Sequence, residues 1–203
     1  MEGPSDGQQR VGGIIILWKA SRFKVGPAPL LPMQLNGEDG NSNRGNGGHV
    51  SITPRGWDQP LTVVGAYGPQ NGTEKVTFIA SLRELLADLD THFIMAGDLN
   101  GVVDRSHLAH PRDLRTDERD LAAMLGVGTD DDSRDSVVGR RLDVQPQDSD
   151  CAFTHRDPRG SHATIDHVVV GGAGSEAWQP LHACFPRVVT PTFVGRPFDH
   201  AFI

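Results

Sequence analysis

Two polar residues, Asp98 and Asn100, follow an apolar run and are the first candidates for chemistry in this sequence. The run ends in Gly97-Asp98-Leu99-Asn100, and an apolar run bounded by turn residues is typical of a buried strand. Gly97 is expected to let the chain turn sharply at the strand end. A carboxylate can transfer a proton or hold a metal, and an amide can donate to a phosphoryl oxygen without adding charge. The pair suits phosphate chemistry, although Asp and Asn also cap turns.

Other reactive residues form weaker patterns. Residues 130–132 are three consecutive aspartates that could bind a cation, but a solvated charged loop is the preferred interpretation. His107 and His110 have the spacing of metal ligands on a helix, which Pro111 and the loop-like surroundings disfavour. The two cysteines of the chain are too few for a disulfide framework, and they are interpreted as buried free thiols in a reducing compartment.

The elements around Asp98 predict a strand–helix–strand unit. Residues 49–53 and 61–67 are interpreted as a hairpin, and residues 74–89 as a helix that leads directly into the Asp98 strand. The apolar stripe of this helix recurs at helical spacing. It consists of Val76, Ile79, Leu82, Leu85, Leu86 and Leu89.

Further elements are predicted on both sides of this unit. A helix is expected at 115–125, with Leu121, Met124 and Leu125 facing inward. Residues 26–48 are predicted to be a low-complexity loop, and its Gly- and Asn-rich centre at 36–48 should have no regular structure. Strands are expected at residues 12–18, 163–170 and 188–194, the last of them an edge strand because Pro191 interrupts it.

Several of the strand-like segments carry a polar residue where a core position would not want one. These residues are Tyr67, Asp98, Asn100, Asp166, Asp199 and His200. The sequence predicts that the acidic residues, Asn100 and His200 converge at one end of the sheets.

Taken in order, these segments resemble the endonuclease/exonuclease/phosphatase superfamily, whose members have the DNase I-like fold. Residues 97–100 match its GDxN motif, and residues 164–169 are similar to its S-x-I-D-H-x-x strand. The other matching segments are 13–17 (GIIIL), 64–69 (VGAYGP), 151–154 (CAFT) and 198–200 (FDH), where Phe198 replaces the family's Ser. The resemblance implies a four-layer α/β sandwich of two packed mixed sheets. Within this superfamily, the sequence is most similar to the endonuclease domains of non-LTR (LINE-type) retrotransposons.

The resemblance implies a role for three catalytic side chains. His200 resembles the histidine that acts beside the scissile phosphate, as a base towards water or as an electrostatic partner. Asp166 resembles the carboxylate that fixes the tautomer of that histidine. Asp98 resembles the proton-transfer carboxylate.

Four further residues resemble binding groups of the family. Asn100 and Tyr67 resemble the donors to the phosphoryl oxygens, and Thr154 resembles a contact to the nucleic-acid backbone. Asp199 resembles a carboxylate beside the divalent metal, which the family implies is Mg²⁺.

The family pattern also contains an Asn strand and a Glu strand ahead of the segment that residues 13–17 resemble. Only residues 1–11 precede that segment here, and they are interpreted as a disordered leader to a domain at 12–203. The expectation is a domain without its N-terminal part and without the principal Mg²⁺ ligand. Such a chain should be poorly soluble and nearly inactive.

Composition limits the alternatives. A net charge of −7 argues against a generic basic nucleic-acid binder, and no apolar run approaches a membrane span. The first ten residues lack the apolar core of a signal peptide, so an intracellular protein, cytoplasmic or nuclear, is expected. The leading hypothesis is a Mg²⁺-dependent DNA endonuclease acting on backbone phosphates. The alternatives are a non-catalytic remnant that binds nucleic acid weakly, and a phosphatase of the same fold. Nothing in the sequence indicates the oligomeric state.

Overall fold

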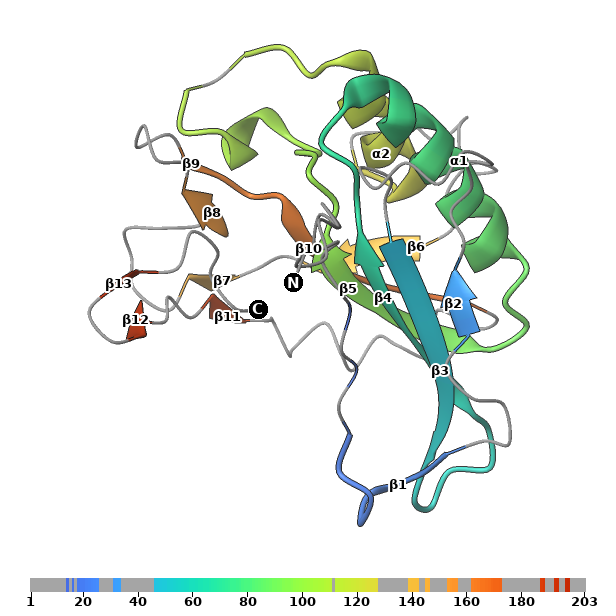
Figure 1. Ribbon diagram of the computed structural model, residues 1–203. Coiled ribbons are helices and arrows are strands. Elements are labelled where there is room, and N and C mark those ends of the chain that lie inside the picture. The colour runs from blue at the N-terminus through green and yellow to red at the C-terminus, as the bar shows by residue number, and fades with distance from the viewer. Residues whose placement is uncertain are drawn as a thin grey trace, which may run out of the picture.

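A computed structural model provides the fold, which is centred on one mixed β-sheet with two helices (Figure 1). It describes residues 14, 16, 18–25, 31–33, 46–110, 112–127, 139–142, 145–146, 153–156, 162–172, 187–188, 192–193 and 196–197. The predicted leader, the acidic run at 130–132 and the pair Asp199 and His200 lie outside these residues.

Seven strands form the main sheet, in the order β1-β3-β4-β5-β10-β6, with β2 also paired to β3. Their bounds are β1 Phe23–Val25, β2 Leu31–Met33, β3 Asn46–Pro54, β4 Leu61–Tyr67, β5 His92–Asp98, β6 Gly139–Leu142 and β10 Asp166–Gly171. The other strands are β7 Gln145–Pro146, β8 His155–Arg156, β9 His162–Ala163, β11 Arg187–Val188, β12 Thr192–Phe193 and β13 Arg196–Pro197. They form three two-stranded pairs, so no second large sheet lies within the described residues.

The predicted strand–helix–strand unit is confirmed. β3 and β4 form an antiparallel hairpin, and β4 runs parallel to β5 across the helix α1, Gly72–Ala87. A parallel pair needs such a crossover, which brings the C-terminal ends of β4 and β5 to the same edge of the sheet. β10 then pairs antiparallel with β5, so that its first residue reaches that edge as well.

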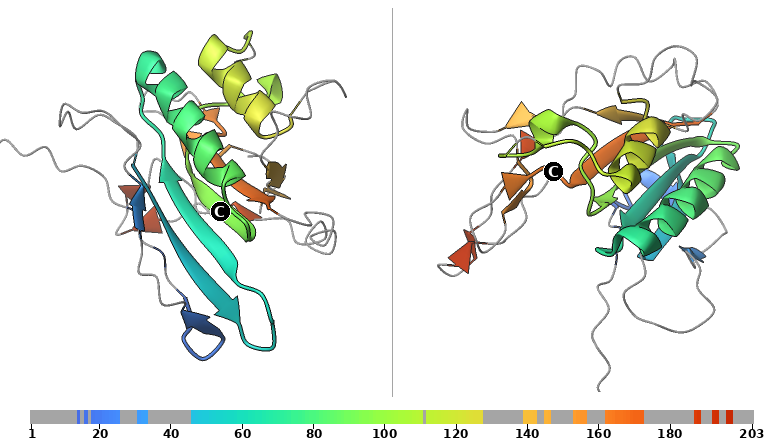
Figure 2. Two further views of the ribbon diagram at one scale, coloured as in Figure 1. Left: turned by 90° about the vertical axis from the view of Figure 1, so that its right-hand side faces the viewer. Right: turned by 90° about the horizontal axis from the view of Figure 1, so that it is seen from above.

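Both helices pack on the same face of the sheet, as Figure 2 shows. α1 contributes Phe78, Ile79, Leu82 and Leu86, and α2, Thr116–Met124, contributes Leu121 and Met124 to one buried cluster. The sheet residues of this cluster alternate along their strands and include Val64, Phe93, Met95 and Val169. A smaller cluster, centred on Val50, Ile52 and Leu61, lies on the opposite face.

The inward face of α1 differs from the prediction at its first turn. Val76, which was predicted to face the core, is 45% exposed, whereas Lys75 is 1% exposed. The buried residues Lys75, Ile79, Leu82 and Leu86 recur at spacings of four and three, which is one helical face. The buried face of α1 therefore begins one residue earlier than predicted, and its first residue, Lys75, is charged.

Two other predictions are wrong at described positions. Ile14, Ile16 and Trp18 are not in a strand, although Ile14 packs over Gly65 and Ile16 packs against the smaller cluster. Ile14 and Ile16 are half-buried without strand pairing, and Trp18 is 39% exposed. Residues 46–48, predicted to lie in a structureless loop, belong to β3, because the end of β4 gives them a partner strand.

Of the strand predicted at 188–194, the structure describes residue 188, which belongs to β11, and residues 192–193, which form β12. Within the part of the chain that the structure describes, no helix has the length and apolar character to span a membrane.

Candidate active site at the ends of three strands

The turn after β5 forms the centre of the candidate site. Asp98 is the last residue of β5, and Asn100 has a positive φ of 50°. This left-handed conformation costs most L residues roughly 1–2 kcal/mol, and Asn is among the few that tolerate it. The Asn100 amide donates to Asp98 Oδ1 at 2.7 Å, and Asn100 Nδ2 donates to the Gly68 carbonyl at 2.7 Å. The side chains of the Gly-Asp-x-Asn motif therefore fold the turn back onto the end of β4.

Two glycines let the turn approach β4 closely. A Cβ atom on Gly97 would lie 1.8 Å from the Ala66 carbonyl oxygen, and one on Gly68 would lie 2.5 Å from the Leu99 oxygen. Gly97 lies within β5, so its role differs from the sharp turn that the sequence suggested. It provides room for the neighbouring backbone, and Asn100 makes the turn.

Asp166 enters the site from β10. It is the first residue of that strand and the register partner of Asp98. Register partners in an antiparallel pair project their side chains on the same face. The loop before Asp166 is fixed by the Leu99 amide, which donates to the Ile165 carbonyl at 2.9 Å. The two predicted carboxylates therefore lie side by side at the sheet edge.

Tyr67 ends β4 beside these carboxylates. The parallel register pairs Gly65 with Ala96, and two residues further along this places Tyr67 next to Asp98. The Gly68 amide donates to the Asp98 carbonyl at 2.7 Å, which holds the two strand ends together. By strand alternation, the predicted residues Tyr67, Asp98 and Asp166 share the face opposite the helices.

Thr154 fixes the backbone at the start of β10, next to Asp166. Its hydroxyl accepts hydrogen bonds from the amides of Ile165 and Asp166, both at 3.1 Å, and the residue is 1% exposed. The sequence prediction was a contact with nucleic-acid backbone. The structure instead buries the hydroxyl and uses it to position the start of β10.

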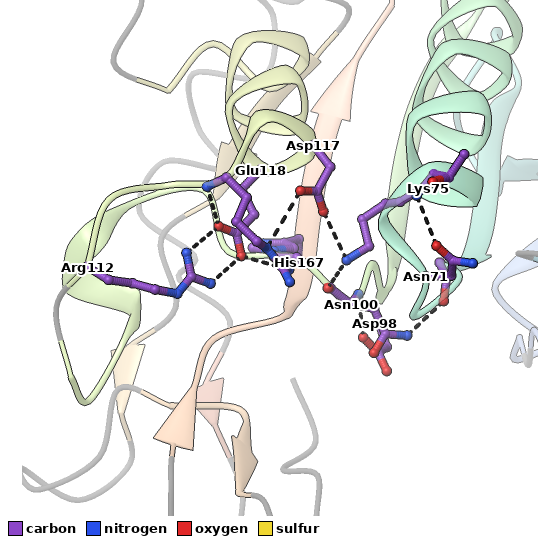
Figure 3. Close-up of polar contacts among 12 residues, drawn as sticks. Asn71, Lys75, Asp98, Asn100, Arg112, Asp117, Glu118 and His167 are labelled. Carbon is purple, nitrogen blue, oxygen red and sulfur yellow. Dashed lines mark hydrogen bonds and ion pairs between the residues drawn. The ribbon is translucent and has the colours of Figure 1, made fainter.

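The helix face of the same turn contains a buried ion pair. Lys75 Nζ donates to the Asn100 carbonyl at 2.6 Å and lies 3.3 Å from Asp117 Oδ2 (Figure 3). Both residues are buried. On the same side, His167 is fully buried, and its Nε2 donates to the Gly101 carbonyl at 2.7 Å, which fixes its tautomer.

Next to Asp117, Glu118 forms ion pairs with two arginines, Arg112 and Arg115, at the start of α2. Arg112 donates to both carboxylate oxygens at 2.7 Å, and the Arg115 amide donates to Glu118 Oε2 at 2.8 Å. Burial alone would raise the pKa of Glu118. The hydrogen bonds from Arg112 and Arg115, together with their charges, outweigh that effect, so the pKa lies below its ordinary value.

The sequence reasoning missed Lys75, Asp117 and Glu118. A usable signal existed for Lys75, because it stands in phase with Ile79, Leu82 and Leu86 on the buried face. No such signal marks Asp117 and Glu118, since acidic residues in a first helical turn are ordinarily solvated and favoured there by the helix dipole.

A metal site is not complete within the described part of the chain. Among those residues, no three His, Cys, Asp or Glu side chains are grouped closely enough to hold a metal ion. The predicted metal ligand Asp199 and the predicted base His200 lie outside it.

A mixed sheet with helices on one face is an α/β architecture, and the similarity to the solved structures below shows the DNase I-like fold. No protein-family model matches the sequence, and no curated protein sequence matches it. Solved structures are similar. A humanized D. rerio TDP2 with 14 mutations aligns at a TM-score of 0.52 and 15% identity, over 90% of this chain and 66% of that one.

Two bacterial structures are similar in the same way. A functionally unknown conserved protein from Enterococcus faecalis V583 has a TM-score of 0.54 and 11% identity, over 91% of this chain and 66% of that one. An endonuclease/exonuclease/phosphatase family protein from Bacteroides thetaiotaomicron has a TM-score of 0.50 and 12% identity, over 76% of this chain and 53% of that one. At these identities the likeness shows the fold. The chain spans somewhat less than two thirds of the length of these three structures.

Proposed function

We propose that this protein is a phosphodiesterase that hydrolyses DNA backbone phosphodiesters, as a retroelement-type endonuclease does. The observation that carries the proposal is the meeting of Tyr67, Asp98 and Asp166 at the ends of three adjoining strands, with Asn100 in the turn between them. Carboxylates that can move protons, beside neutral donors that can bind phosphoryl oxygens, are the groups this hydrolysis needs.

The proposed roles are those that the resemblance to the endonuclease/exonuclease/phosphatase superfamily implies for each group. Water adds to phosphorus while its proton passes to His200, and Asp166 holds the histidine in the tautomer that accepts this proton. The bond to the leaving oxygen breaks as Asp98, in its protonated form, transfers its proton to that oxygen and becomes a carboxylate. Asn100 and Tyr67 stabilise the negative charge on the non-bridging oxygens.

Asn100 Nδ2 has two hydrogens and donates one of them to the Gly68 carbonyl. Among the described contacts no group takes the second hydrogen, so it can be donated to a substrate. The amide is therefore oriented before any substrate binds. An oriented donor costs no reorganisation at the moment of reaction, which favours the transition state over the ground state.

Mg²⁺ belongs to the proposal as the cofactor, with Asp199 as a ligand, and its chemistry would be to stabilise charge on the phosphoryl group.

DNA is the proposed substrate for two reasons. One of the similar structures is D. rerio TDP2 complexed with a single-strand DNA product, at a TM-score of 0.52 and 15% identity. The second is the sequence resemblance to LINE-type endonuclease domains through the helix before the Gly-Asp-x-Asn motif and the G-G-I-I-I-L-W-K opening. With a net charge of −7, the chain must hold phosphates by local contacts and not by a broad basic surface.

Nicking of supercoiled plasmid in Mg²⁺ tests the proposal. Without the principal Mg²⁺ ligand only weak activity is expected, so the purified chain should convert plasmid to open circles slowly but measurably, and His200→Ala and Asp166→Asn should each slow this further by about 10²–10⁴-fold. Asp58→Asn is the matched control, because Asp58 is exposed in the β3–β4 connection and should leave the rate unchanged.

Three results would contradict the proposal. Equal nicking by wild type and His200→Ala would indicate a contaminating nuclease. Hydrolysis of a phosphate monoester with the plasmid left intact would indicate a phosphatase. Plasmid binding without hydrolysis would indicate a non-catalytic protein.

A further inference from the structure

We infer that Lys75 is a positioning residue for the Asn100 turn, and that its buried ammonium holds the turn in its binding geometry from the helix side of the sheet. This inference rests on the proposed function for its meaning in catalysis, and on the contacts of Lys75 alone for its structural part. Lys75 touches no group that would contact the phosphate.

The first observation is the location of the ammonium. A lysine is rarely fully buried unless it is paired, yet Lys75 is 1% exposed. Its stem follows the apolar face of α1, and the Cδ atom would be 3.9 Å from a Cβ atom on Gly101. The chain therefore places a charge directly beneath the backbone of the Asn100–Gly101 segment, where an apolar residue would continue the stripe of α1.

The second observation is the partner of the ammonium. Lys75 Nζ donates to the Asn100 carbonyl at 2.6 Å, a short charge-assisted hydrogen bond to the residue with positive φ. The other two bonds of Asn100 run to Asp98 and Gly68. Asn100 is thus fixed at its amide, its side chain and its carbonyl, and only the carbonyl is held from the helix face.

The third observation separates the positioning role from charge balance. Asp117 Oδ2 makes no hydrogen bond within the described residues, so its attraction to Lys75 is ionic across 3.3 Å. Arg115 Nε lies 3.6 Å from Asp117 Oδ1 and also compensates this carboxylate. The Lys75 ammonium contacts two different groups, the Asn100 carbonyl and the Asp117 carboxylate. A substitution at Asp117 therefore removes the ionic partner and leaves the hydrogen bond to Asn100 in place.

The experiment is a cycle of Lys75→Met, Asp117→Asn and the double variant. Lys75→Met keeps the apolar stem and removes the ammonium. Asp117→Asn keeps the ammonium on the Asn100 carbonyl and removes its ionic partner. The double variant leaves no unpaired buried charge, so its folding should recover relative to Lys75→Met.

The readout is amide hydrogen exchange at Asn100 under native conditions, with urea unfolding in parallel. Exchange should be faster by about tenfold or more in Lys75→Met and in the double variant, because a charged hydrogen bond to the turn is lost. In Asp117→Asn it should stay within about threefold of wild type, since that bond remains. Recovery of wild-type protection in the double variant would overturn the inference and make Lys75 only a counter-ion. Equal acceleration in Asp117→Asn would overturn it as well.

Plasmid nicking adds the catalytic part of the test. Lys75→Met and the double variant should lower kcat by about tenfold at similar KM, because the turn is displaced but the phosphate contacts are chemically intact. A wild-type chain that does not nick plasmid would contradict the proposed function. The exchange order among the three variants would still decide whether Lys75 positions the turn.

Discussion

The two faces of the sheet at the Asp98 turn differ in the burial and pairing of their polar side chains. On the helix face, Lys75 and Asp117 are buried and paired with each other. On the opposite face, Asp98 and Asp166 lie together as register partners and are only partly buried. Two neighbouring carboxylates repel each other whenever both are ionised, whereas a buried ion pair is neutral as a unit. One face therefore fixes the turn, and the other carries the groups suited to chemistry.

The first way to break this comparison is to force the two strands apart. Gly97→Ala should destabilise the protein by about 3 kcal/mol or more, because its Cβ would lie 1.8 Å from the Ala66 carbonyl, which is backbone and cannot rotate away. Nicking should be lost together with stability. Urea unfolding measures the effect.

Gly72→Ala is its matched control. Gly72 begins α1, and a Cβ atom there meets nothing within 4 Å. This variant should be neutral or more stable by up to about 0.5 kcal/mol. Equal stability of Gly97→Ala and Gly72→Ala would show that β4 and β5 do not approach as closely as described.

A smaller effect is expected at Thr154. Thr154→Val leaves the amides of Ile165 and Asp166 without their acceptor, which should cost about 1–3 kcal/mol and slow nicking by displacing Asp166. Thr62→Val is the comparison, because Thr62 is also buried but bonds only to Thr91 Oγ1. It should cost stability without a matching loss of rate. A similar loss of rate in both variants would remove the special role of Thr154.

The smallest effect concerns Glu118 and depends on pH. Its pKa in the folded protein lies below the ordinary value of 4.5, so its contribution to stability is complete above pH 4.5. That contribution is lost as the pH falls below 4.5 through the folded-state pKa. Glu118→Gln should therefore cost about 1 kcal/mol at pH 6, since Arg112 and Arg115 are half exposed.

Urea unfolding of both proteins at pH 6, 4.5 and 3 measures this dependence. The stability difference between wild type and Glu118→Gln should shrink at the lowest pH. A difference that grows as the pH falls would contradict the direction assigned to Glu118.

The local elements could be predicted because short-range chemistry determines them. The stripe of α1 and the hairpin of β3 and β4 follow from spacing and turn residues, and all were expected near their observed bounds. The polar residues after β5 also indicated the site. Each of these signals lies within one segment, where periodicity and turn preferences act directly.

The long-range parts could not be predicted from such signals. The pairing of Asp98 with Asp166 depends on the register of β5 against β10, which no local pattern encodes. Lys75 was missed because a lysine near a helix start ordinarily faces solvent, and only the carbonyl of Asn100 together with Asp117 makes its burial favourable. Ile14 and Ile16 show the converse, since both are half-buried against the sheet but neither is in the strand that their apolar character predicted.

The most direct test of the central claim compares catalysis with stability in Asp98→Asn. The amide side chain introduced at position 98 keeps an oxygen that can accept the hydrogen bond from the Asn100 backbone N–H. The free energy of unfolding should therefore stay within about 0.5 kcal/mol of wild type. The nicking rate should fall by at least about 100-fold, because the proton-transfer carboxylate is lost. A variant that folds normally and nicks DNA at the wild-type rate would show that the chemistry lies elsewhere, and the account of this site would be wrong.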